Sequence, residues 1–138
     1  MTKSGNVKIR ALAALAVVLL LALGGLLAAE WRWRATHALV QPAAESGDGA
    51  WLAEVREVAE AQVLAEGAHG VFVGRPGMQL RSLKPGLVFV ASCDAITPRW
   101  FTPRRLVIEC DLRSGEPVLL RNFVEDVVIE LAINRRFG

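Results

Sequence analysis

The chain has 138 residues, a formal charge of +2 and a hydrophobic content of 53%, which leaves room for one domain of modest size and not for two. Its basic excess lies near the N-terminus, in Lys3, Lys8 and Arg10, whereas from Glu30 onward 13 basic residues face 14 acidic ones. This distribution argues against a polyanion-binding surface, so we expect no nucleic acid among its partners.

An apolar run without charge or proline occupies residues 11–29. At about 1.5 Å rise per residue, a helix of this length crosses the roughly 30 Å of a hydrocarbon core. The sequence therefore predicts a transmembrane helix at 11–29, preceded by a basic tail at 1–10. The alternative is a cleaved secretory signal, because Ala22-Leu23-Gly24 resembles a small-residue cleavage site. The mature protein would then be a secreted soluble domain.

Two indoles and two guanidinium groups follow the run, in Trp31, Arg32, Trp33 and Arg34. We interpret them as a membrane-interface anchor, because both groups favour the level of the lipid headgroups. Three basic residues precede the run and only two follow it closely, which keeps the N-terminus cytoplasmic. We therefore expect a single-pass protein of a bacterial inner (cytoplasmic) membrane, with the lipid bilayer as one partner and an extracytoplasmic, periplasmic C-terminal domain.

Residues 37–49 hold Pro42, Ala43, Ala44, Ser46 and two glycines, a composition that suits a short tether. We therefore assign residues 30–49 to a juxtamembrane segment and linker, and the distal domain to residues 50–138. After Trp51 the apolar residues follow a helical period, with Asp48 as a candidate N-cap and Gly67 as a candidate C-terminal stop. Strand patterns then appear at 71–73, 79–83, 87–93 and 106–112, and a turn at 113–117 precedes a last strand at 118–121.

The final segment, residues 122–137, fits two periods. Asn122 with Glu125 resembles a capping box ahead of a helical stripe, yet Ile129, Leu131 and Ile133 also alternate as in a strand. We favour the helix because the cap and the stripe agree. The predicted fold class is therefore α+β: a transmembrane helix, then a small domain with a helix, an antiparallel β-meander and a C-terminal helix.

Cys93 and Cys110 both lie near the end of an apolar strand pattern. Antiparallel pairing of these strands would bring the sulfurs within reach of a disulfide, which suits a domain outside the cytoplasm. Two buried thiols that never meet are the alternative. A redox-active pair is less consistent with the wide spacing and the strand setting.

The segment between the cysteines sets aromatic residues beside arginines and two prolines. Trp and Arg are enriched at binding hot spots, and a stiff loop loses little entropy on docking. We therefore predict a partner-binding loop formed by Arg99, Trp100, Phe101, Arg104 and Arg105. In the alternative reading the two aromatics fold back onto the sheet.

No catalytic, cofactor or metal motif stands out, and His37 and His69 have no neighbouring ligands at a metal-binding spacing. Whether the chain is an enzyme stays open, and the sequence favours a binding role. The leading hypothesis is a protein-interaction module, an accessory or assembly subunit of a membrane or envelope complex that binds other membrane or envelope proteins. The rival is a membrane-tethered thiol enzyme using Cys93 and Cys110.

Overall fold

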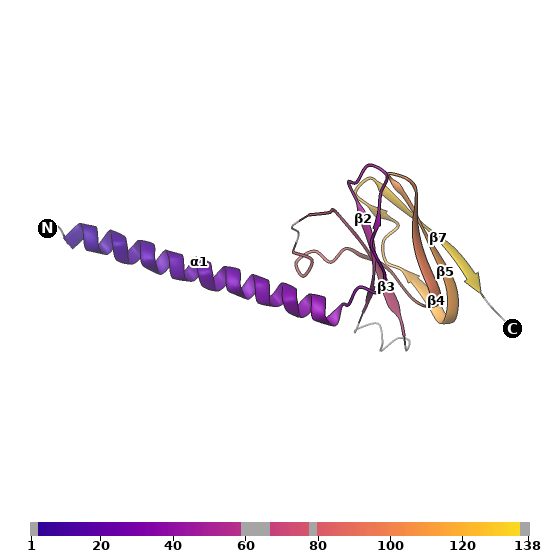
Figure 1. The fold of residues 1–138 in the computed structure, drawn as a ribbon, viewed down its shortest axis with the longest axis horizontal. Helices are drawn as coiled ribbons and strands as arrows, with labels where there is room; N and C mark the ends of the chain where they lie inside the picture. Colours follow the sequence, from indigo (N-terminus) through magenta and orange to yellow (C-terminus); the bar gives the residue numbers. More distant parts are fainter. Residues whose placement is uncertain (1–2, 59–66, 78–79, 136–138) are drawn as a thin grey trace.

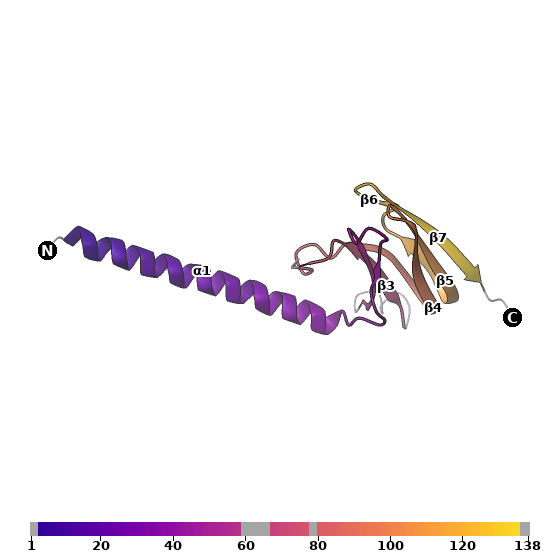
Figure 2. The same cartoon turned by 45° about the horizontal axis from the view of Figure 1, so that its top comes forward.

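The computed structural model describes residues 3–58, 67–77 and 80–135, which form one long helix and a strongly curved β-sheet. The helix, α1 (Lys3–Thr36), extends away from the sheet, and the described chain ends on the opposite side of the molecule (Figure 1). A view turned by 45° shows the same separation (Figure 2).

Helix α1 contains the apolar run and continues seven residues beyond it. Its most apolar stretch has a mean hydropathy of 2.7 and is not covered by any described part of the protein, so it is long and apolar enough to cross a membrane. The run contains no proline, and the Gly24-Gly25 pair within it does not end the helix. At its last turn the Thr36 hydroxyl donates to the carbonyl of Trp33 at 3.0 Å.

Seven strands form a single mixed sheet in the order β1-β2-β3-β4-β5-β7-β6 among the described residues. Neighbouring strands run antiparallel, except that β7 lies parallel to β5. The strands are β1 (Ala44–Glu45), β2 (Leu52–Glu57), β3 (His69–Gly74), β4 (Leu87–Thr102), β5 (Arg105–Leu119), β6 (Phe123–Val124) and β7 (Val127–Arg135).

The sheet curls so that strands far apart in its order meet across the core. The indole N–H of Trp100 in β4 donates to the carbonyl of Ala44 in β1 at 3.0 Å, although two strands separate β1 from β4. The enclosed core is apolar and includes Val55, Phe89, Leu106, Ile108 and Val127, each at most 1% exposed. Curling allows one sheet to bury its own concave face without a covering helix.

The predicted C-terminal helix is wrong, and with it the predicted α+β class. Residues 123–135 form β6, a two-residue turn and β7, and the turn places Glu125 at a positive φ of 53°. Val127 and Ile129 alternate into the core at 0% and 3% exposure. The segment forms a strand because β5 offers an edge whose backbone N–H and C=O groups need hydrogen-bond partners.

The predicted helix after Trp51 is also wrong where the structure describes it. Residues 52–57 form β2, which pairs with β3, while residues 59–66 lie outside the described part of the chain. Ala53 and Val55 face the core, and Glu54 and Arg56 on the other face are buried as well. A strand that is covered on both faces does not alternate between apolar and polar residues, so its sequence lacks the pattern that distinguishes a strand from a helix.

The segment 37–49, expected as a tether, contributes β1 and a bridge between Leu39 and Arg56 to the sheet. The strand patterns at 71–73, 87–93 and 106–112 are confirmed inside β3, β4 and β5. The expected turn at 113–117 is wrong because β5 continues to Leu119. The described residues of the segment 79–83 form a turn rather than a strand.

The expected loop at 94–105 is a β-hairpin, in which β4 runs to Thr102 and β5 begins at Arg105. Pro98 is tolerated in β4 because its missing N–H faces away from β5. The carbonyl of Ile96 accepts a hydrogen bond from Gln41 Nε2 at 3.1 Å, so the backbone groups of Ile96 point away from β5. Pro98 lies two residues further along β4, and its backbone nitrogen therefore points to the same side.

Candidate functional site

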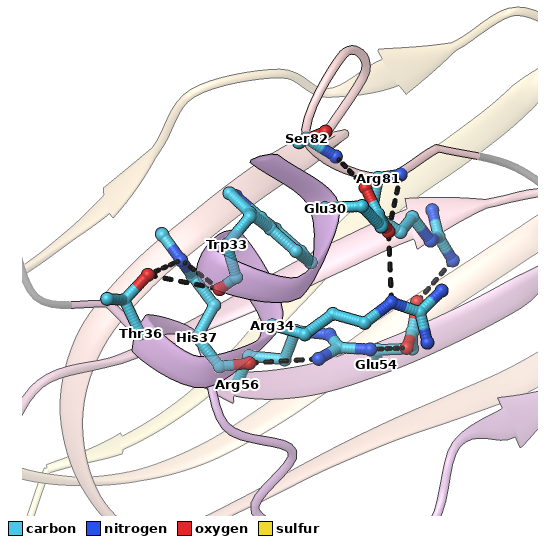
Figure 3. Close-up of polar contacts among 9 residues, drawn as sticks. All are labelled: Glu30, Trp33, Arg34, Thr36, His37, Glu54, Arg56, Arg81 and Ser82. Carbon is cyan, nitrogen blue, oxygen red and sulfur yellow. Dashed lines mark hydrogen bonds and ion pairs between the residues drawn. The ribbon is translucent and has the colours of Figure 1, made fainter. Parts of the chain in front are cut away.

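The last turns of α1 are joined to the connection between β3 and β4 through the carboxylate of Glu30, which is 7% exposed. It accepts hydrogen bonds from the backbone amides of Arg81 at 3.0 Å and Ser82 at 2.8 Å, and from Arg34 Nε at 2.9 Å (Figure 3). Two amides of the β3–β4 connection are therefore satisfied by a side chain from the helix. This arrangement fixes the connection at the level of Glu30.

An aromatic stack secures the helix end beside this carboxylate. The rings of Trp33 and His37 stack with centroids 4.6 Å apart, and Phe72 of β3 meets Trp33 edge-on at 5.7 Å. The guanidinium of Arg56 lies 5.1 Å from the Trp33 ring centroid and donates to the carbonyl of His37 at 2.9 Å. Packing and polar contacts thus hold the helix end against β2 and β3 (Figure 3).

A buried charge cluster lies under the helix end. Glu54 bridges Arg56 and Arg81, and the three side chains are between 7% and 9% exposed. Removing one partner of such a cluster leaves an uncompensated buried charge, which costs about 3–5 kcal/mol. We name the group Glu30, Trp33, His37, Glu54, Arg56 and Arg81 the helix–sheet junction.

The predicted membrane-interface residues divide between two environments. Trp31 is 77% exposed and Arg32 is exposed, so both are free to meet lipid headgroups. Trp33 packs against the sheet, and Arg34 pairs with Glu30. Sequence reasoning missed Glu30, whose signal was its position as the first acidic residue of the chain, directly after the apolar run.

The structure brings the predicted partner-binding residues to one hairpin end but gives them different roles. Trp100 folds back onto the core, and Arg104 pairs with Asp48 at 2.9 Å and Asp126 at 3.0 Å. Arg99 pairs with Glu109 at 3.3 Å.

Phe101 and Arg105 remain at the surface of this hairpin end. Phe101 is 61% exposed, and the Arg105 guanidinium lies 5.7 Å from its ring centroid. Arg105 is opposite Val128 of β7, and Val128 is opposite Phe123 of β6, which is 56% exposed. Opposed residues point to the same side of a sheet, so two exposed phenylalanines flank an arginine on the outer face. We call Phe101, Arg105 and Phe123 the aromatic patch.

Hydrogen bonds near this hairpin end lower the pKa values of two carboxylates. The hydroxyl of Ser46 and then the amide of Ala50 hold the pKa of Asp48 below its ordinary value. A hydrogen bond from Arg105 likewise holds the pKa of Glu130 below its usual range. Both carboxylates are therefore ionised at neutral pH and keep the arginines in place.

The outer edge of β7 is open beyond its start. The amide of Val128 donates to the carbonyl of Arg104, and the amide of Ile129 donates to the carbonyl of Asn122, each at 2.8 Å. The backbone N–H and C=O groups of odd-numbered residues in β7 therefore point away from β5. Beyond Ile129, no strand in the described part of the chain pairs with this edge. The backbone groups of Leu131 and Ile133 are thus available to another strand.

Cys93 and Cys110 form a disulfide between β4 and β5, with their Cα atoms 5.6 Å apart. Both residues are at most 4% exposed. A thiol nucleophile at either position would first require reduction of this buried bond.

Comparison of the chain with protein-family models, curated proteins and solved structures finds no match. Within residues 3–58, 67–77 and 80–135, no group of three or more His, Cys, Asp or Glu side chains gathers in a way that could hold a metal ion.

Proposed function

We propose that this chain is a single-pass membrane protein whose sheet domain binds a partner protein outside the cytoplasm, as an accessory or assembly subunit of a membrane complex. The observation that carries this proposal is the open edge of β7. An unpaired strand edge is a template for an added strand, and proteins that have no use for one normally cover it.

The position of this edge suits a partner arriving from outside the membrane. In Figures 1 and 2, β7 is on the side of the sheet that faces away from α1. The aromatic patch adjoins the start of β7 through the pairing of Arg105 with Val128. An added strand would supply main-chain hydrogen bonds, and the patch would supply side-chain contacts of the kind enriched at hot spots.

Three observations support the membrane topology. The apolar part of α1 is long enough to span a bilayer, and three basic residues precede it. The disulfide between Cys93 and Cys110 suits an oxidising compartment, which for a membrane protein is the side away from the cytosol.

The test uses the backbone N–H of Leu131, which points to the open edge. A photo-crosslinking amino acid at Ala132, which is exposed on β7, is expected to capture one partner reproducibly in intact cells. The same amino acid at Arg113 of β5 serves as the control position. Leu131→Pro is then compared with Leu131→Ala, because both lose side-chain packing but only proline removes the outward N–H.

We expect Leu131→Pro to weaken the captured complex roughly tenfold or more relative to Leu131→Ala, through lost main-chain hydrogen bonds and the bulk of the ring. Equal binding by the two variants would exclude strand addition at this edge. Loss of binding on Phe101→Ala with Phe123→Ala, but not on Leu131→Pro, would place the partner on the aromatic patch alone.

A further inference from the structure

A cavity of about 490 Å³ opens beside the connection between β3 and β4. Apolar side chains form part of its wall, among them Trp51, Leu83 and Val124. The charged side chains that line it are four basic ones and one acidic one: Arg75, Arg81, Lys84, Arg121 and Glu125. The cavity therefore combines an apolar surface with an excess of positive charge.

Two of these basic groups are already neutralised. Arg81 pairs with the buried Glu54, and Arg75 pairs with Glu125 at 3.1 Å while lying 4.5 Å from the Trp51 ring centroid.

Lys84 and Arg121 form no ion pair with any residue that the structure describes. The cavity wall thus carries two cations that no described acidic side chain pairs with, and these suit a singly or doubly charged anion.

Trp51 lines the same cavity, and its indole N–H is a buried donor next to that wall. Trp51 is 2% exposed, and its Nε1 has no hydrogen-bond acceptor within the described chain. Buried indoles normally find an acceptor, because an unpaired donor in an apolar setting is costly. A ligand oxygen that displaced the groups covering this N–H would supply that acceptor.

The cavity lies at the level where α1 leaves the apolar run. Glu30 is the first residue after this run, and it binds the amides of Arg81 and Ser82. Leu83, the next residue, is 67% exposed. In Figures 1 and 2 the connection between β3 and β4 reaches back along α1 farther than any other described part of the sheet domain. With α1 in a bilayer, this connection would lie on the side of the sheet domain that faces the bilayer surface.

We infer that this cavity binds the phosphate headgroup of an anionic phospholipid from the bilayer in which α1 sits. Lys84 and Arg121 contact the phosphate, the Trp51 N–H donates to one of its oxygens, and Leu83 lies against the start of the acyl chains. The neutralised Arg75 and Arg81 hold the wall in place. The inference rests on α1 occupying a membrane, as proposed above.

The experiment uses the full chain in nanodiscs of phosphatidylcholine with an increasing share of phosphatidylglycerol. Native mass spectrometry measures retained phosphatidylglycerol, and the melting temperature measures its effect on stability. Lys84→Gln with Arg121→Gln is expected to lower the apparent affinity about fivefold for each cation, roughly 25-fold together. Arg99→Gln with Arg113→Gln removes the same charge from the β4–β5 hairpin and is expected to change it little.

Trp51→Phe separates a seated headgroup from general surface attraction, because it keeps every charge. We expect a loss of roughly tenfold in phosphatidylglycerol affinity through the missing hydrogen bond to a charged acceptor. Unchanged affinity in this variant, or equal losses in the two double variants, would overturn the cavity assignment. An equal rise in melting temperature from glycerol 3-phosphate in pure phosphatidylcholine discs would show a soluble phosphate as the ligand instead of a lipid.

Membrane insertion of α1, on which this inference rests, is tested by a separate measurement. A chain that washes off vesicles in alkaline carbonate would overturn both the membrane proposal and this inference. A chain that stays in the vesicles but shows no preference for phosphatidylglycerol would overturn the headgroup site alone.

Discussion

The carboxylate of Glu30 ties the helix end to the connection between β3 and β4, beside the packing of Trp33 against Phe72. It is the only acidic side chain in the described part of α1, and it satisfies the amides of Arg81 and Ser82 in the connection between β3 and β4. Trp33 and Trp100, predicted as an anchor and a docking residue, both found partners inside the protein. An indole has an apolar body and one donor, so its sequence context does not distinguish these outcomes.

Glu30→Ala is expected to leave the amides of Arg81 and Ser82 without an acceptor. Such a loss costs about 1–3 kcal/mol locally, or a factor of roughly 5 to 150 in amide exchange rate. Hydrogen exchange of the full chain in micelles measures it at these two amides. Glu57→Ala, which removes an exposed carboxylate of β2, is the control. Unchanged exchange at Arg81 and Ser82 in Glu30→Ala would contradict the described coupling.

At the scale of elements, the strands whose sequences predict them are those central to the sheet. Residues 87–93 and 106–112 are rich in β-branched and apolar residues, and they form the buried halves of β4 and β5. The segments β2 and β7 are wrongly predicted to be helices, because their sequences also fit a helical period. Their conformation depends on a neighbouring strand far away in the chain, which local pattern does not reveal.

The disulfide joins the two longest strands and closes a loop with a sequence separation of 17 residues. On the chain-entropy account, such a bond contributes about 3 kcal/mol by restricting the unfolded chain. We expect reduction to lower the free energy of unfolding by about that amount, measured by urea titration of the full chain in micelles.

The double variant Cys93→Ala with Cys110→Ala provides the control for this prediction. It is expected to match the reduced protein and to be insensitive to reductant. If reductant left the unfolding midpoint of the parent chain in place under conditions that open the disulfide, the bond would have no stabilising role.

At the scale of the whole molecule, the sheet domain is held at a fixed position on a helix able to span a bilayer. The helix–sheet junction and the open edge of β7 lie on opposite sides of the domain (Figures 1 and 2). The two proposals use this separation: the lipid site is proposed on the side of α1, and the protein partner on the side of β7.

The topology is expected to show itself in fractionation. The full-length chain, at 15.0 kDa, should stay with vesicles in alkaline carbonate, because removing the apolar run from lipid is strongly unfavourable. A C-terminal tag should be digested by protease added outside spheroplasts. A mature protein lacking about the first 24 residues would indicate signal cleavage, and a protected C-terminal tag would reverse the orientation.

The sequence by itself determined the features that depend on local composition. The helix within residues 3–36, the two central strands and the feasibility of pairing Cys93 with Cys110 follow from hydropathy, residue type and cysteine position. Only the tertiary structure decided the C-terminal strands, the curl of the sheet, the burial of Glu30 and the open edge of β7. Each of these depends on which distant segment supplies hydrogen-bond partners, and no local period encodes that choice.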